Sequence, residues 1–467
     1  MKPFGRRVTL AAPAPAPAPA PTDPATETPT DPTLEPTAAP TTPPAAMPGE
    51  PAGGSVVDAA RTPPLDSAVG LAPDAEVTPE APPPDPILEL PMTRVDGTTT
   101  SVRTCLQETD TDAFVVVHGG IVVAQWYRTP EDEVAEHALM SITKSVVGCA
   151  AGILIAQGCL DPDLPAAHYV PELLHSGYAQ VSVRELLDMR TADSTDSEDY
   201  VDPHGELAQV AAAVGEPWPG LAVWTPGAPL PTTLRDVIVT ATRPAAAVAV
   251  EPVSRPFCYR SLDTETLGWV LERAAGRPIL ELIEGVITPL RLEAPGSIAV
   301  DAAGVPQASG GLALRARDVA TFALMLLHGG AAGDTQVVPT AFVKDTRTGG
   351  PDSTEAMLAR VDRVLGPGAG LAAGGGFYRN QFWIPRSGAR TLLCLGIHGQ
   401  LAFIDSETDT VVIKLSSWPT PQNPVHFTDG LECARAVAHH LGGRDPEERR
   451  GIAGRTSPPA TRAARSA

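Results

Sequence analysis

Short β-branched runs gather at the two ends of residues 86–441, and longer apolar stretches with helical character lie between them. Residues 112–127 contain two such runs on either side of Gly119 and Gly120, a pattern that predicts a β-hairpin. Near the other end, apolar runs bounded by turn residues predict further strands at 377–383, 392–397, 401–404 and 410–415.

The middle of this region favours helices. Residues 142–157 are small or apolar without alternation and end at Gly158, which predicts a buried helix. Further helices are expected at 183–189, 262–275, 279–290, 317–327 and 431–441. Strands at both ends with helices between them predict an α+β fold: an antiparallel sheet flanked by helices, with a mostly helical insertion at about 160–300. A cleft between these two parts is the natural place for a site.

Composition separates both ends of the chain from this region. Of the 51 prolines, 24 fall within the first 92 residues, where Phe4 is the only aromatic residue. Such a segment cannot bury enough apolar surface to offset the entropy of ordering it. We therefore predict a disordered Pro/Ala/Thr-rich arm at residues 1–85, a folded domain at 86–441, and a disordered tail at 442–467.

Charge and cysteine usage narrow the function classes. A net charge of −21 argues against nonspecific binding to nucleic acid or to anionic membranes. No apolar run is long enough for a membrane span. The six cysteines form no CxxC pair, which argues against a zinc site. We expect reduced thiols and a cytoplasmic protein. Residues 1–7 resemble the start of a signal peptide, but the apolar stretch after them is short, so export is the alternative.

Ser141 and Lys144 carry the clearest chemical signal. They lie three residues apart at the start of the predicted helix, so their side chains share one face. A serine hydroxyl needs a nearby base, and lysine serves only when its surroundings disfavour the ammonium form. A serine and a lysine at this spacing also occur by chance, as a helix cap and a surface charge. Here the helix has almost no polar face, so Lys144 is expected to point into protein.

The segment His137-Ala-Leu-Met-Ser-Ile-Thr-Lys-Ser145 resembles the nucleophile motif of serine β-lactamases and penicillin-binding proteins. The second motif of that superfamily is Tyr-x-Ser or Tyr-x-Asn, and residues 259–261 read Tyr-Arg-Ser at the start of a predicted helix, as in class C members. The resemblance covers about residues 90–441 and implies a β-lactamase-like fold.

The third motif departs from that of the β-lactamases. In place of Lys-Thr-Gly, the late strand carries Gly396-Ile-His-Gly-Gln400, which puts β-lactam hydrolysis in doubt. This segment resembles the 6-aminohexanoate-dimer hydrolases, a group of amidases and carboxylesterases. Further shared features are Ser309-Gly-Gly311, the closing Lys414-Leu-Ser-Ser-Trp-Pro419, and a loop containing Tyr200.

The resemblance implies roles for particular residues. Ser141 attacks a carbonyl carbon, Lys144 lowers the barrier for that attack, and Tyr259 relays the proton to the leaving group. The backbone N–H groups of Ser141 and Ile397 form the oxyanion hole. Candidate substrate-binding residues are Tyr200, Ser261, His398 and Trp383.

Several of these candidates have a second interpretation. Tyr200 could simply pack within its loop, and Trp383 could belong to the core. His398 suits a structural position beside the oxyanion strand better than a place in a Ser-His-Asp triad. That triad would also need a Gly-x-Ser-x-Gly turn, which Ser141 lacks.

The sequence therefore predicts a serine hydrolase that cleaves a small ester or linear amide and needs no metal or cofactor. A related alternative is a D-amino-acid peptidase or transesterase. An alternative of another class is a catalytically silent binding protein whose arm carries the function. The sequence does not decide between a monomer and a homodimer.

Overall fold

The computed structural model describes residues 1–10, 85–191, 200, 202, 205–216, 231–241, 255–359, 371, 374–388 and 390–443. All of them belong to one compact unit made of residues 1–14 and 84–467. Among these described residues, no helix has both the length and the apolar character needed to cross a membrane.

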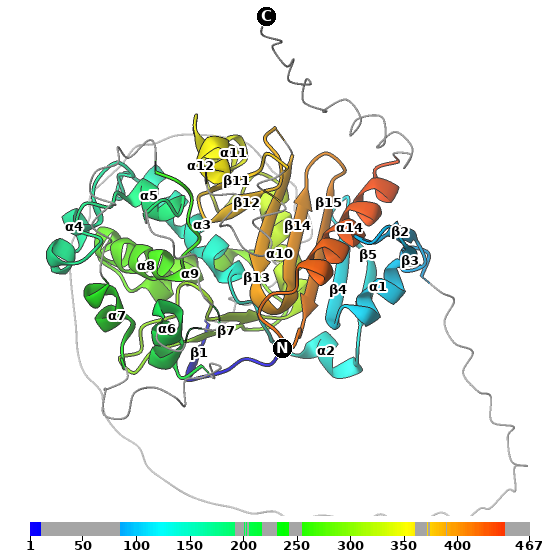
Figure 1. Ribbon diagram of the computed structural model, residues 1–467, viewed down its shortest axis with the longest axis horizontal. Helices are drawn as coiled ribbons and strands as arrows, with labels where there is room; N and C mark the ends of the chain where they lie inside the picture. Colours follow the sequence, from blue (N-terminus) through cyan, green and yellow to red (C-terminus); the bar gives the residue numbers. More distant parts are fainter. Residues whose placement is uncertain are drawn as a thin grey trace, which may run out of the picture. The chain divides into compact units, whose positions relative to one another are not determined.

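A seven-stranded antiparallel sheet joins the two ends of the domain (Figure 1). Its order is β11-β12-β13-β14-β15-β4-β5, so the C-terminal strand β15 pairs with the early strand β4. The strands are β4 (Thr111–His118), β5 (Ile121–Tyr127), β11 (Phe377–Arg379), β12 (Phe382–Ile384), β13 (Thr391–Gly396), β14 (Gln400–Asp405) and β15 (Thr410–Ser416). This confirms the predicted α+β architecture.

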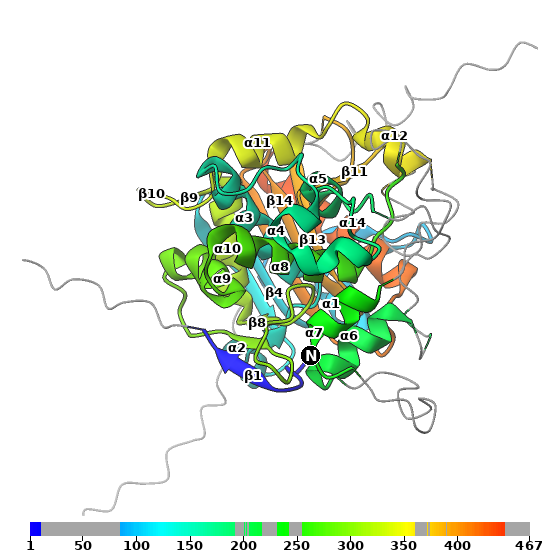
Figure 2. The same cartoon turned by 90° about the vertical axis from the view of Figure 1, so that its left-hand side faces the viewer.

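Helices bury both faces of this sheet, because alternate side chains of each strand point to opposite sides. Val115 and Ile413 belong to one core cluster, which includes residues of α10 (Ala316–Leu327) and α3 (Ile142–Ala156). Phe114 and Val412 belong to a second cluster, with residues of α1 (Val102–Glu108) and α14 (Pro424–Leu441). In Figure 1, α14 crosses in front of the sheet and α10 lies behind it, and Figure 2 shows the sheet between them.

A smaller sheet, in the order β1-β7-β8-β6, lies next to the start of α3. It contains β1 (Arg7–Thr9), β6 (His137–Ala138), β7 (Ser297–Ala299) and β8 (Leu312–Leu314). The two remaining pairs are β2 (Pro91–Thr93) with β3 (Thr99–Ser101) and β9 (Ala331–Ala332) with β10 (Thr335–Gln336).

The described part of the predicted insertion is helical. Its elements are α4 (Ala166–Tyr169), η1 (Pro171–His175), α5 (Val183–Leu187), α6 (Glu206–Val214), α7 (Leu234–Thr240), α8 (Ser261–Ala275), α9 (Ile279–Ile287) and η5 (Thr288–Leu290). Both α8 and α9 pack on α3. Elsewhere lie α2 (Pro130–Val134), α11 (Thr340–Thr348), α12 (Ser353–Leu358) and η6 (Ile397–Gly399).

Three predictions differ from the structure. Residues 1–10 are not part of a disordered arm: β1 pairs with β7, and Leu10 is buried in the core. Residues 377–383 form a tight hairpin rather than one strand, because Asn380 and Gln381 adopt positive φ angles of 54° and 72°. Helix α14 starts at Pro424, seven residues early, where Asn423 caps it. Residues 11–84 and 444–467 lie outside the described residues.

Candidate active site

Ser141 occupies the turn between the small sheet and the central helix. Strand β6 ends at Ala138, Met140 adopts a positive φ of 48°, and Ser141 is the N-cap of α3. A positive φ is uncommon for a residue with a side chain, and such residues often occur at functional sites. The sharp turn leaves Ser141 partly exposed, although twelve residues of the helix that follows it are buried.

Lys144 points inward along the same face of α3 and is only 1% exposed. Its Nζ lies 2.8 Å from the Oγ of Ser141, 2.9 Å from the Oγ of Ser261 and 2.8 Å from the carbonyl oxygen of Ser309. A buried amine with three oxygen partners is held in one position. The predicted contact between serine and lysine is therefore present.

Tyr259 lies two residues before α8, and its ring centroid is 5.1 Å from the Nζ of Lys144. The ring stacks on Trp383, with centroids 5.2 Å apart and an angle of 28° between the planes. Phe257 and Tyr378 contact both rings edge-on or at a tilt. Three aromatic side chains therefore surround the tyrosine and hold its ring beside the lysine.

The end of β13 passes close to the turn that carries Ser141. A Cβ atom on Gly396 would lie 2.7 Å from the carbonyl oxygen of Leu139 and 3.0 Å from the Cβ of Met140. Only glycine therefore fits without a shift of the backbone. The next residue, Ile397, lines the same pocket as Ser141.

The pocket above Ser141 has an empty volume of about 340 Å³. Of the predicted site residues, Ser141, Tyr200, Ser261 and Ile397 line it. The other described residues that line it are Phe4, Met140, Leu207, Glu216, Gln307, Ser309 and Gly310, of which Ser309 and Gly310 belong to a segment that the sequence marked as a shared feature.

Two predicted substrate-binding residues are placed elsewhere. His398 has a φ of 60°, its Nδ1 lies 2.7 Å from the carbonyl oxygen of Trp418, and its backbone N–H donates to Pro421. Burial lowers the pKa of His398. Trp383 is 7% exposed and packs in the core against Tyr259. Neither is among the described residues that line this pocket.

Two acidic residues near Lys144 were not predicted. Burial raises the pKa of Glu216 to about 7, while a hydrogen bond from Gln307 and the charge of Lys144 act in the opposite direction. Gln307 is 4% exposed, and its Oε1 has no hydrogen-bond partner among the described residues. Glu216 follows the C-terminal end of α6, and no motif marks it.

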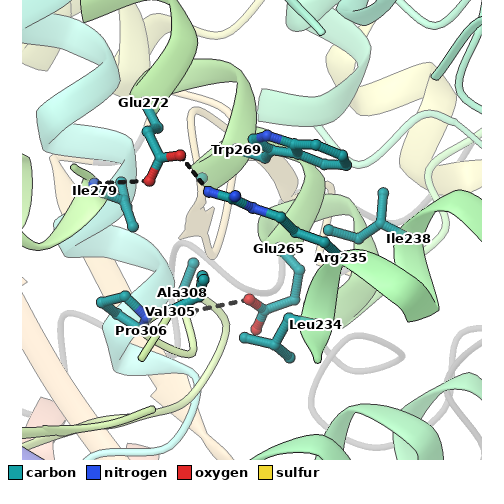
Figure 3. Close-up of a pocket in the computed structure, with 11 residues that line it drawn as sticks. Leu234, Arg235, Ile238, Glu265, Trp269, Glu272, Ile279, Val305, Pro306 and Ala308 are labelled. Carbon is teal, nitrogen blue, oxygen red and sulfur yellow. Dashed lines mark hydrogen bonds and ion pairs between the residues drawn. The ribbon is translucent and has the colours of Figure 1, made fainter. Parts of the chain in front are cut away.

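Glu265 lies behind the pocket, in the buried part of α8. Its carboxylate accepts hydrogen bonds from the backbone N–H groups of Ala308, at 3.0 Å, and Ser309, at 2.8 Å. Figure 3 shows this side chain reaching across a hollow toward Ala308. The carbonyl of Ser309 accepts from Lys144, so Glu265 fixes one partner of the lysine. No motif marks Glu265 in the sequence, and its burial becomes visible only in the structure.

The chain is similar to known proteins in sequence and in fold. The family model for β-lactamase matches residues 103–432. The 6-aminohexanoate-dimer hydrolase of Paenarthrobacter ureafaciens is 34% identical over 340 residues, which is 71% of this chain and 79% of the relative. A Bacillus anthracis structure assigned as a 6-aminohexanoate-dimer hydrolase superposes with a TM-score of 0.65 at 26% identity, over 77% of this chain and 86% of that one. The penicillin-binding protein homologue of Pyrococcus abyssi shares the fold, with a TM-score of 0.50 at 19% identity over 76% and 80% of the two chains.

Proposed function

The chain belongs to the β-lactamase family and is a serine hydrolase, and we propose that it cleaves ester or linear amide bonds through an acyl intermediate on Ser141. The observation that carries this proposal is the 2.8 Å contact between the Nζ of Lys144 and the Oγ of Ser141. A buried amine at hydrogen-bond distance is what a serine nucleophile requires for activation.

The three oxygen atoms around Lys144 are compatible with a neutral lysine that acts as a base. The carbonyl of Ser309 can only accept a hydrogen bond, whereas the hydroxyl groups of Ser141 and Ser261 can accept or donate. A neutral amine can therefore donate to Ser309 and Ser261 while it accepts the proton of Ser141. The proton can therefore pass from Ser141 to Lys144 without any movement of heavy atoms.

Acylation follows from this geometry. The Oγ of Ser141 forms a bond to the substrate carbonyl carbon, and its proton passes to Lys144. The tetrahedral intermediate carries a negative oxygen, which accepts hydrogen bonds from the backbone N–H groups of Ser141 and Ile397; each such donor contributes about 3 kcal/mol. When the intermediate collapses, the bond to the leaving alcohol or amine breaks, Tyr259 gives its hydroxyl proton to the leaving group, and Lys144 returns its extra proton to Tyr259.

Deacylation reverses the roles. Water attacks the ester carbon of acyl-Ser141, its proton passes through Tyr259 and Lys144, and Ser141 regains its hydrogen as the acid leaves. The aromatic stack around Tyr259 supports this relay, because it holds the ring beside Lys144 in both half-reactions. Tyr200 and Ser261 line the pocket and are proposed to contact the substrate.

The substrate is proposed to be a small linear ester or amide. The relatives named as 6-aminohexanoate-dimer hydrolases support a linear amide, and the partly apolar pocket beside Ser141 accommodates a short chain.

We also propose a cytoplasmic location. The six cysteines are all free thiols, and five of them are buried, which suits a reducing compartment.

The test is the intact mass of the protein after reaction with a fluorophosphonate, together with turnover of p-nitrophenyl butyrate. Wild type should gain one adduct and hydrolyse the ester, and Ser141→Ala should do neither. Ser145→Ala is the matched control, because Ser145 lies on the same helix, is buried and donates to the carbonyl of Gln381. Absence of an adduct on folded wild-type protein would refute the proposal.

A further inference from the structure

Residues 1–10 run along the small sheet beside the active site, and we call them the N-terminal strap. Its strand β1 pairs antiparallel with β7, with Val8 opposite Ile298. Beyond the strand, the N–H of Leu10 donates to Gly296, at 2.8 Å, and the N–H of Val300 donates to Arg6, also at 2.8 Å. In Figures 1 and 2 the blue strand β1 lies at the edge of this sheet.

Arg7 ties the strap to the loop that carries part of the pocket. Its Nη2 donates to the carbonyl oxygens of Ser297, at 2.8 Å, and Gly311, at 2.7 Å, and its Nε donates to the Oγ of Ser297, at 2.9 Å. Gly311 directly follows Gly310, which lines the pocket. One side chain therefore joins the strap to the wall of the site.

Gly5 brings the strap against helix α6. The φ of Gly5 is 70°, and a Cβ atom there would lie 2.4 Å from the carbonyl oxygen of Val214. Close passage over the end of α6 is therefore possible only with glycine. Glu216, two residues beyond Val214, lines the pocket, and so does Phe4, the neighbour of Gly5 in the strap. The chain path thus inserts the Phe4 side chain into the wall that faces Ser141.

We propose that the strap is a wall of the substrate pocket and that Phe4 limits the length of the apolar group that the site accepts. The inference rests on the proposed hydrolase function and names a specificity-determining residue for it. Phe4 is the one phenyl ring among the described residues of this wall, where it lies with the apolar Met140, Leu207 and Ile397 and the polar Glu216 and Gln307. An alkyl chain of the substrate is the group that gains from contact with a phenyl ring.

The experiment compares kcat/KM for p-nitrophenyl esters from acetate to decanoate in wild type, Phe4→Ala and Lys2→Ala. Removal of the ring vacates space for about two methylenes, and each buried methylene is worth roughly fourfold in binding. The octanoate-to-butyrate ratio should therefore rise about tenfold or more in Phe4→Ala. Lys2 is an exposed residue of the same strap, so Lys2→Ala should keep the wild-type ratio.

Arg7→Ala is the second variant, because it loosens the strap without changing Phe4. It should shift the ratio in the same direction as Phe4→Ala. An unchanged chain-length profile in a folded Phe4→Ala protein would overturn the proposal. A shift of equal size in Lys2→Ala would also overturn it.

Amide hydrogen exchange separates this inference from the proposed function. It is measured on the inactive Ser141→Ala protein, so it depends on structure alone. The amide of Leu10 should be protected, because it donates to Gly296. Rapid exchange of the Leu10 amide would refute the proposal that the strap forms a wall of the pocket. Failure of the wild type to hydrolyse any ester would count against the hydrolase mechanism, and the exchange result would still decide the placement of the strap.

Discussion

Replacement of Glu265 by glutamine tests whether the structure behind the pocket controls the chemistry within it. Both carboxylate oxygens accept backbone N–H donors, from Ala308 and Ser309. A glutamine side chain has one oxygen and one NH2 group, so one N–H must face another donor. The loss of a hydrogen bond to a charged acceptor costs about 1.5–3 kcal/mol. Relief of the buried charge, which raises the pKa of Glu265, offsets part of this cost. We expect a net loss of about 2 kcal/mol in unfolding free energy.

The larger effect should be on catalysis. When the N–H of Ser309 loses its acceptor, the carbonyl of the same residue can shift, and that carbonyl accepts from the Nζ of Lys144. A displacement of about 1 Å near a reacting group can reduce the rate up to about a hundredfold. We expect kcat to fall by about ten- to a hundredfold with little change in KM. The acidic limb of the kcat/KM profile should move to lower pH, because a neutral glutamine no longer favours the ammonium form of Lys144.

The assay combines urea unfolding with kcat and KM for p-nitrophenyl butyrate between pH 5 and 10. The matched control is Glu272→Gln, on the same helix and in the same hollow (Figure 3). Glu272 pairs with the partly exposed Arg235 and does not contact Ser309, so its replacement should change unfolding by less than about 1 kcal/mol and leave kcat unchanged. Wild-type kcat and an unshifted pH profile in a folded Glu265→Gln protein would refute the reasoning.

Three further predictions concern the pocket itself. Tyr259→Phe removes only the hydroxyl and should lower kcat/KM by about a hundredfold or more while near-ultraviolet circular dichroism stays unchanged; a smaller loss would exclude the relay. Gly396→Ala places a methyl group 2.7 Å from the carbonyl of Leu139 and should slow fluorophosphonate labelling of Ser141, which mass spectrometry follows. Glu216, with its pKa of about 7, is neutral below that pH and charged above it, so kcat/KM for an ester with an anionic acyl chain should fall as pH rises through 7. Glu216→Gln should remove that fall, and a profile identical to that of wild type would contradict the assignment.

The hydrophobic pattern of the sequence predicted well those strands and helices that depend on residues close together in the chain. The hairpin at 112–127 and the buried helix that starts at Ile142 are set by short-range alternation and by an uninterrupted apolar run, and both are present. Strands at both ends of the domain predicted one antiparallel sheet, but the pattern does not say that β15 pairs with β4, because nearly three hundred residues separate them. The resemblance to known motifs supplied the joint location of Ser141, Lys144 and Tyr259.

The rest of the pocket was missed for a different reason. Phe4 lies in a segment whose average composition predicts disorder. The structure nevertheless orders its first residues through backbone hydrogen bonds between β1 and β7. Glu216 and Gln307 come from a helix end and a loop, which approach Ser141 only through tertiary packing. For Trp383 the sequence left both a pocket and a core position open, and its stacking on Tyr259 becomes visible only in three dimensions.

Two side chains from distant parts of the chain form hydrogen bonds to the same loop, residues 307–311. The position of this loop in the site therefore depends on both the strap and α8. Glu265 accepts from the N–H groups of Ala308 and Ser309, and Arg7 donates to the carbonyl of Gly311. Residues that share one backbone segment do not act independently, so their replacements should not add. In a double-mutant cycle with Glu265→Gln and Arg7→Ala, we expect a coupling of about 1 kcal/mol both in the free energy of unfolding and in RT ln kcat/KM. Strict additivity would mean that the strap and α8 hold separate parts of the loop, and it would refute the coupling of Arg7 to Glu265 through residues 307–311.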